Sequence, residues 1–154
     1  IRDRDSGLIT EKDIVEAIPK TLQDNIFDLT QLILTKKIDQ ARDLVKDLTL
    51  QGEDEIKLIA IMLGQFRLYT QVKILQESGQ TESQMVSSLG HYLGRNPNPY
   101  QIKFALRDTR GLSLNFLQDS IRYLIQADYQ IKTGVYEKGY LFEKALLQIA
   151  SQSN

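Results

Sequence analysis

The chain has 154 residues, of which 42% are hydrophobic, and this apolar content is enough to build one compact core. Its 19 Lys and Arg residues nearly balance its 20 Asp and Glu residues, so a net charge of −1 provides no overall field that attracts nucleic acid. The absence of cysteine excludes disulfides and thiolate chemistry and fits a reducing cytoplasm. No apolar run approaches the roughly 20 residues of a membrane helix, so we expect a cytoplasmic protein with no membrane span.

Three short helices are predicted in the first third of the chain. The first is expected to end before Pro19, because proline cannot continue a helix. Apolar residues at helical spacing predict a second helix over residues 22–34. Asp39 is expected to cap a third helix, which ends at Gly52.

Residues 54–76 form the strongest helical pattern of the chain. Apolar side chains occupy one face of this predicted helix and also lie beside it on both flanks. We therefore place the helix at the centre of the fold, with Phe66 in the core. The acidic residues 53–55 precede it, where negative charge favours the positive end of the helix dipole.

Four further helices are predicted in the second half of the chain. A short helix over residues 81–89 is followed by a loop over residues 90–98, which contains several helix breakers and the single histidine, His91. Pro99 opens the next helix, Ser113 is expected to cap a long one that ends near Thr133, and residues 138–150 form the last. No stretch shows strand-like alternation, so the fold class is all-α, a bundle of about seven to eight helices.

The sequence contains no constellation typical of an enzyme. His91 has no second ligand at helical spacing, and no glycine-rich phosphate-binding loop is present. The serines lack both a nucleophile elbow and a partner base. We therefore expect no catalytic residue, no metal and no cofactor in this chain.

A basic segment over residues 91–110 favours weak contact with DNA. It contains Arg95, Lys103, Arg107 and Arg110 against Asp108, a local charge of +3. The two helices around it resemble a helix-turn-helix, but the predicted loop of about nine residues exceeds the usual turn of about 3–4 residues. A DNA-binding helical domain that uses this segment is therefore the alternative interpretation.

Most aromatic residues are predicted to lie in the core rather than to stack on nucleic acid bases. Together with Leu and Ile residues they recur at helical spacing, which is typical of the buried face of a helix. This prediction covers Phe66, Tyr69, Phe104, Phe116, Tyr123 and Phe142.

Several stretches together resemble the delta subunit of the bacterial DNA polymerase III clamp loader over nearly the whole chain. They are Asp24-Asn25-Ile26-Phe27-Asp28-Leu29; Gln65-Phe66-Arg67-Leu68 followed by Gln71-Val72-Lys73; Asn98-Pro99-Tyr100 before Ala105-Leu106; and Ala127-Asp128 before Ile131-Lys132-Thr133-Gly134. None of these stretches is a catalytic signature. The resemblance depends on their order and spacing.

The resemblance implies that residues 1–19 are the tail of an ATPase-like lid domain and that residues 20–154 form a helical collar domain. Such a collar joins those of the tau/gamma and delta prime subunits in a pentameric ring that places the sliding clamp on DNA. The clamp itself would be bound by an N-terminal module outside this sequence. The resemblance also implies a non-catalytic component of the polymerase holoenzyme, with DNA contacted only indirectly or weakly.

Three tyrosines, Tyr129, Tyr136 and Tyr140, are candidates for the subunit interface. They lie around Gly134 and Gly139, and tyrosine is enriched at interfaces because it combines an apolar body with a polar tip. The alternative is that the same residues are partly buried and close the end of the bundle.

Overall fold

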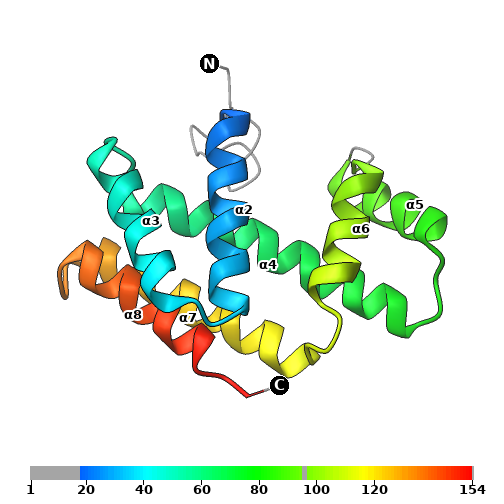
Figure 1. Ribbon diagram of the computed structural model, residues 1–154. Coiled ribbons are helices and arrows are strands. Elements are labelled where there is room, and N and C mark those ends of the chain that lie inside the picture. Colours follow the sequence, from blue (N-terminus) through cyan, green and yellow to red (C-terminus); the bar gives the residue numbers. More distant parts are fainter. Residues whose placement is uncertain (1–17, 95–96, 154) are drawn as a thin grey trace.

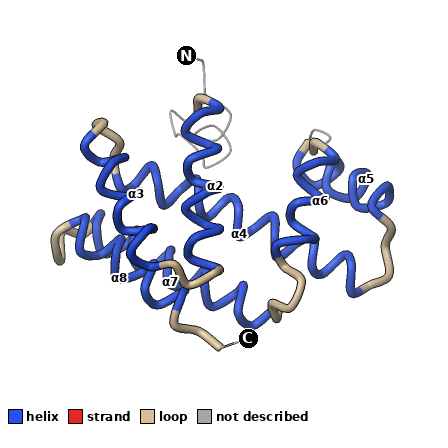
Figure 2. Tube along the Cα trace, viewed as in Figure 1, coloured by secondary structure: helices blue, strands red, loops and turns tan. Residues whose placement is uncertain are grey.

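The computed structural model describes residues 18–94 and 97–153, and these residues form seven α-helices and no strand. Figures 1 and 2 show their arrangement. The helices are α2 (Lys20–Leu34), α3 (Ile38–Leu50), α4 (Glu55–Glu77), α5 (Glu82–Leu93), α6 (Pro99–Asp108), α7 (Leu114–Lys132) and α8 (Lys138–Ala150). The all-α prediction is confirmed. The helix expected before Pro19 falls outside the described residues except at its last position.

Helix α4 runs through the centre of the molecule, as its sequence pattern predicts (Figure 1). Its consecutive residues Ile61, Met62 and Leu63 are all buried, which requires neighbours on more than one side of the helix. Helix α4 is long and apolar enough to cross a membrane by length and composition alone. Its buried side chains, however, belong to the hydrophobic core of the bundle.

The other helices form two groups along α4. Helices α2, α7 and α8 pack around α4, and α3 packs on α2 and α8, whereas α5 and α6 pair beside the C-terminal half of α4 (Figure 1). Phe27 of α2 contacts Phe104 of α6, with ring centroids 5.9 Å apart. Phe104 is nevertheless 42% exposed, so its prediction as a core residue was wrong. It lies at the edge where α6 meets α2.

Local capping explains where several helices begin. Ser113 accepts a hydrogen bond from the Phe116 backbone N–H at 3.0 Å, as predicted for α7. Asn98 caps α6 through a capping box, with Pro99 in the first turn. Asp39, in contrast, does not cap α3, which begins one residue earlier. It lies in the first turn, where its charge still favours the helix dipole.

The predicted loop over residues 90–98 is shorter than the sequence suggested. Helix α5 continues to Leu93, so Gly90 and His91 are helical and the connection covers only residues 94–98. A glycine inside a helix costs only about 1 kcal/mol relative to alanine, and Gly90 is buried against the bundle. The helix ends instead at Gly94, whose φ of 76° is the left-handed conformation that glycine adopts without strain.

A buried carboxylate joins three helices. The Asp108 side chain at the end of α6 is 2% exposed and accepts hydrogen bonds from the Gln31 amide of α2 at 2.8 Å and the Tyr69 hydroxyl of α4 at 3.0 Å. The Arg107 Nε donates to it at 3.0 Å. Burial, together with the neighbouring Asp108 carboxylate, raises the pKa of Tyr69 above its ordinary value. The phenol therefore stays protonated and remains a donor.

A lysine fixes the turn between α2 and α3 against the end of α8. Lys36 adopts a positive φ of 62°, and its ammonium donates to the backbone carbonyls of Ala150 and Gln152. Carbonyl groups at a helix C-terminus lack intrahelical partners, so a cation there satisfies them and favours the dipole. The contact holds the start of α3 beside the end of α8.

Replacing Phe66 tests the central position of α4. Phe66 is completely buried, so Phe66→Ala should lower the free energy of unfolding by about 3–5 kcal/mol through lost burial and the remaining cavity. Ile74→Ala on the same helix is the control, since Ile74 is 46% exposed and should cost much less. Urea unfolding followed by circular dichroism measures both. Equal urea midpoints for Phe66→Ala and the unchanged chain would contradict the placement of Phe66 in the core.

Replacing Tyr69 tests the polar junction at Asp108. Tyr69→Phe keeps the ring but removes the donor, so one acceptor site of a buried carboxylate loses its partner, at a cost of about 1–3 kcal/mol. Tyr100→Phe, at a position 66% exposed, should leave stability unchanged. Chemical denaturation at pH 7 compares the two variants. A Tyr69→Phe variant as stable as Tyr100→Phe would show that the hydrogen bond contributes nothing.

Candidate functional site

The turn between α7 and α8 presents a group of large side chains. Helix α7 ends in a Schellman motif, in which the N–H of Gly134 donates to the Ile131 carbonyl and that of Val135 donates to the Gln130 carbonyl. Gly134 has a φ of 71°, which a side chain would strain. This tight turn begins the short connection from α7 to α8.

The side chains at this turn are exposed. Tyr129, Val135, Tyr136 and Tyr140 are 66%, 52%, 62% and 56% exposed, and we call these four residues the tyrosine patch. The rings of Tyr136 and Tyr140 meet edge to face, with centroids 6.0 Å apart. Because each tyrosine is more than half exposed, the structure does not bury them to close the bundle. Their role as an interface stays a prediction.

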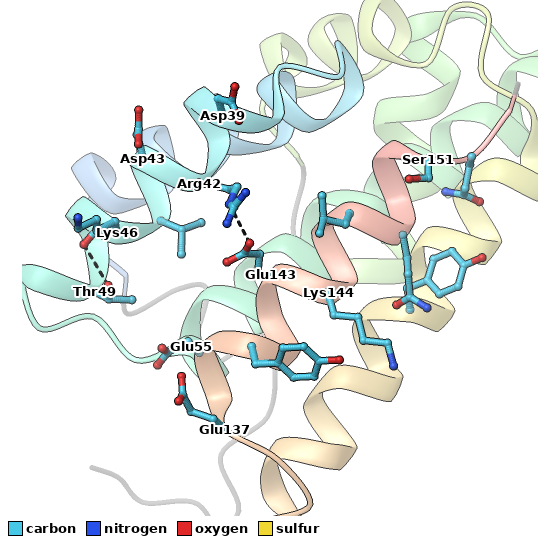
Figure 3. Close-up of a pocket in the computed structure, with 17 residues that line it drawn as sticks. Asp39, Arg42, Asp43, Lys46, Thr49, Glu55, Glu137, Glu143, Lys144 and Ser151 are labelled. Carbon is cyan, nitrogen blue, oxygen red and sulfur yellow. Dashed lines mark hydrogen bonds and ion pairs between the residues drawn. The ribbon is translucent and has the colours of Figure 1, made fainter.

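A groove between α3 and α8 continues from the tyrosine patch. Its volume is about 1160 Å³, and Tyr140 lines both the groove and the patch. Val45 of α3 and Leu147 of α8 add apolar surface to its lining. Figure 3 shows the pocket between these two helices. A small apolar notch lined by Ile38, Val45 and Leu147 lies in the same region. The patch and the groove together form one surface that spans α3, α7 and α8.

Charged side chains border the groove and are more acidic than basic. The acidic residues are Asp39, Asp43, Glu55, Glu137 and Glu143, and the basic ones are Arg42, Lys46 and Lys144. One ion pair crosses the groove, between Arg42 Nε and Glu143 Oε1 at 2.8 Å (Figure 3). Both side chains are more than a third exposed, and such pairs contribute at most about 1 kcal/mol. A docking partner could therefore displace this pair at little cost.

The N-termini of α4 and α8 are joined next to this surface. Asp54 caps α4 by accepting a hydrogen bond from the Ile56 N–H at 2.7 Å, and Lys138 of α8 lies 3.1 Å from the same carboxylate. The backbone hydrogen bond lowers the pKa of Asp54, and Lys138 lowers it further. The carboxylate therefore stays ionised at neutral pH. Of the acidic residues 53–55, Asp54 is the predicted cap and Glu55 lies in the first turn of α4.

The structure brings most of the predicted basic residues together on α6 or just after it. Lys103, Arg107 and Arg110 line one hollow, whereas Arg95 lies outside the described residues. Lys73 of α4 lines the same hollow and was missed by the sequence analysis. Only the fold could reveal it, because Lys73 is 30 residues from the nearest of the other cations.

The groove between α3 and α8 was also missed. Its two walls come from residues 39–55 and 137–152, which no local pattern connects. Tyr140, which was predicted to lie at an interface, was the signal in the sequence for this groove. In the part of the chain that the structure describes, no group of three or more His, Asp or Glu side chains is arranged to hold a metal ion.

Comparison with known proteins gives a consistent family assignment. Residues 23–149 match the family model described as the DNA polymerase III delta subunit, C-terminal domain. The chain is 33% identical over 153 residues to the DNA polymerase III subunit delta of Bacillus subtilis, covering 99% of this chain and 42% of that protein. The solved Bacillus subtilis DNA clamp loader delta protein is similar with a TM-score of 0.76 and 33% identity, over 94% of this chain and 41% of that chain.

These matches cover almost all of the chain, but the chain spans only about two fifths of the length of either relative. The all-helical fold and the matched range agree with the resemblance found in the sequence. The chain therefore belongs to the family of DNA polymerase III delta subunits and corresponds to their C-terminal domain.

Proposed function

We propose that this chain is the non-catalytic collar domain of a clamp-loader delta subunit, which assembles a pentameric loader with tau/gamma and delta prime in the cytoplasm. The loader places the sliding clamp on DNA during replication. Residues 20–154 would form the collar and residues 1–19 the end of a lid domain. In this proposal, the delta subunit contacts the clamp through an N-terminal module.

The observation that supports assembly is the continuous surface made by the tyrosine patch and the α3–α8 groove. Folded domains rarely expose several large apolar side chains together unless a partner covers them. Tyrosine is suited to such contacts because its ring is large and rigid and its hydroxyl keeps a hydrogen-bonding group at the rim. We therefore assign this surface to contact with a neighbouring collar domain.

A non-catalytic role agrees with the described residues. The Tyr69 hydroxyl donates to the Asp108 side chain inside the bundle, and neither residue lines the α3–α8 groove. The large groove is bordered by side chains whose charges are mostly solvated. In this proposal the neighbouring subunits hydrolyse ATP, and this domain supplies the contacts that hold the ring together.

The alternative function is a DNA-binding domain that uses residues 91–110. The connection between α5 and α6 is shorter than predicted, which removes part of the argument against a helix-turn-helix. The two functions differ in one measurement. A domain whose only role is DNA binding would bind duplex DNA with steep salt dependence and would form no complex with clamp-loader subunits.

Mixing this chain with the matching tau/gamma and delta prime subunits tests the proposed assembly. Sizing chromatography at micromolar concentrations should show a complex that contains all three proteins. The chain alone should be mainly monomeric, because one collar domain supplies only a share of a ring. The absence of any complex would overturn the proposal.

Replacing tyrosines of the patch tests which surface makes the contact. Tyr136→Glu or Tyr140→Glu should weaken assembly at least about tenfold, because a carboxylate must lose its hydration inside the contact. Thermal stability should be unchanged, since both positions are more than half exposed. Tyr100→Glu on α6 is the control, with 66% exposure outside the patch. Equal assembly by all three variants would exclude the tyrosine patch as the interface.

A further inference from the structure

A basic hollow lies at the other end of α4 from the tyrosine patch. It has a volume of about 370 Å³ and is lined by Lys73 of α4, by Lys103 and Arg107 of α6 and by Arg110, which follows α6. Glu82 of α5 is the one acidic residue in its lining. Helix α4 has 23 residues, about 35 Å at 1.5 Å per residue, so the hollow and the patch are well separated.

Two of the four cations are held in place by neutral or buried groups. Lys73 Nζ donates to the Thr109 carbonyl at 3.2 Å, which positions the ammonium without neutralising it. Arg107 lies over the Phe104 ring, 4.9 Å from its centroid, while its Nε donates to Asp108. The terminal nitrogens of Arg107 therefore remain available on a side chain whose orientation is fixed.

The other two cations have no acidic partner in the described part of the chain. Lys103 and Arg110 are both exposed, and neither makes an ion pair with residues 18–94 or 97–153. Even when Glu82 and Asp108 are counted, the four cations leave a local charge of +2. Like charges gathered around one hollow repel one another, so an anion bound among them would be favoured.

The arrangement of these cations fits phosphate groups in a row. Lys103 and Arg107 are four residues apart, about 6 Å along α6, and Arg110 lies two residues beyond the end of this helix. A nucleic acid strand in a duplex carries one phosphate per about 3.4 Å of helix axis, so this stretch faces two or three phosphates. Arginine adds a planar fork of donors that matches phosphate oxygens.

The lining also distinguishes nucleic acid from an acidic peptide. Leu106 is the one large apolar side chain among the residues that line the hollow, so the hollow offers no apolar pocket for a hydrophobic side chain of a peptide. An amphipathic peptide helix that docks in a groove is held by apolar anchors, whereas a phosphate backbone is held by charge and hydrogen bonds. We propose that the basic hollow binds the phosphate backbone of a nucleic acid strand, without reading its base sequence.

Fluorescence anisotropy with a labelled 20-base-pair DNA duplex of arbitrary sequence tests this site on the 154-residue chain. Titrations in 50, 100 and 200 mM NaCl give both the affinity and its salt dependence. The paired variant Lys103→Ala with Arg110→Ala should weaken binding at least about tenfold at 50 mM and reduce the slope of log K against log salt by about 1 to 2. Binding of a second duplex of different sequence should be equally strong.

The matched control removes one lysine and one arginine elsewhere. Lys20→Ala with Arg122→Ala changes the net charge equally, at exposed positions that do not line the hollow. This control should keep most of the affinity. The proposal is overturned if the unchanged chain does not bind the duplex, if both paired variants lose the same affinity, or if a polyglutamate peptide of equal charge competes as well as unlabelled DNA.

The DNA-binding test and the subunit-assembly test examine different surfaces, so one proposal can be overturned while the other stands. The proposed subunit interface lies on α3, α7 and α8, whereas the hollow lies on α4, α5 and α6. The Lys103→Ala with Arg110→Ala variant should therefore form the complex with tau/gamma and delta prime as well as the unchanged chain. Circular dichroism and thermal unfolding of this variant should match those of the control.

Discussion

Helix α4 constrains the rest of the structure because apolar side chains surround most of its circumference. A helix of this kind is stable in water only when other elements cover it on several sides. Helices α2, α7 and α8 cover one part, and α5 and α6 cover the part nearer its C-terminus. The buried residues Leu58, Phe66 and Val72 mark successive positions along this shared core. The bundle is therefore organised around one helix rather than around pairs of equal helices.

The buried Asp108 connects the two groups of helices that α4 brings together. Its partners come from α2 and α4, so the end of α6 is held by polar contacts where the apolar core thins. A carboxylate buried in this way is stable only when its lone pairs are satisfied. Asp108 also accepts a hydrogen bond from Arg107 Nε, and this bond fixes the orientation of the Arg107 side chain. Core stability and the geometry of the basic hollow thus depend on the same residue.

The two exposed surfaces differ in chemistry and lie near opposite ends of α4. The tyrosine patch and the α3–α8 groove combine aromatic side chains with a weak, solvated ion pair, which suits a protein partner. The hollow on α6 is polar and cationic, which suits phosphate. In the two proposals, subunits contact one end of the domain and nucleic acid contacts the other, so the two surfaces can be tested separately.

The sequence by itself determined the all-α class, the central place of residues 54–76, the cap at Ser113 and the start of α6 at Pro99, because each depends on spacing and side chains within a few turns. It misplaced the end of α5, since either Gly90 or Gly94 can end a helix and only packing decides which does. Only the tertiary structure decided the exposure of Phe104, the α3–α8 groove and the addition of Lys73 to the hollow. These features arise from contacts between residues far apart in the chain, and no local periodicity encodes such contacts.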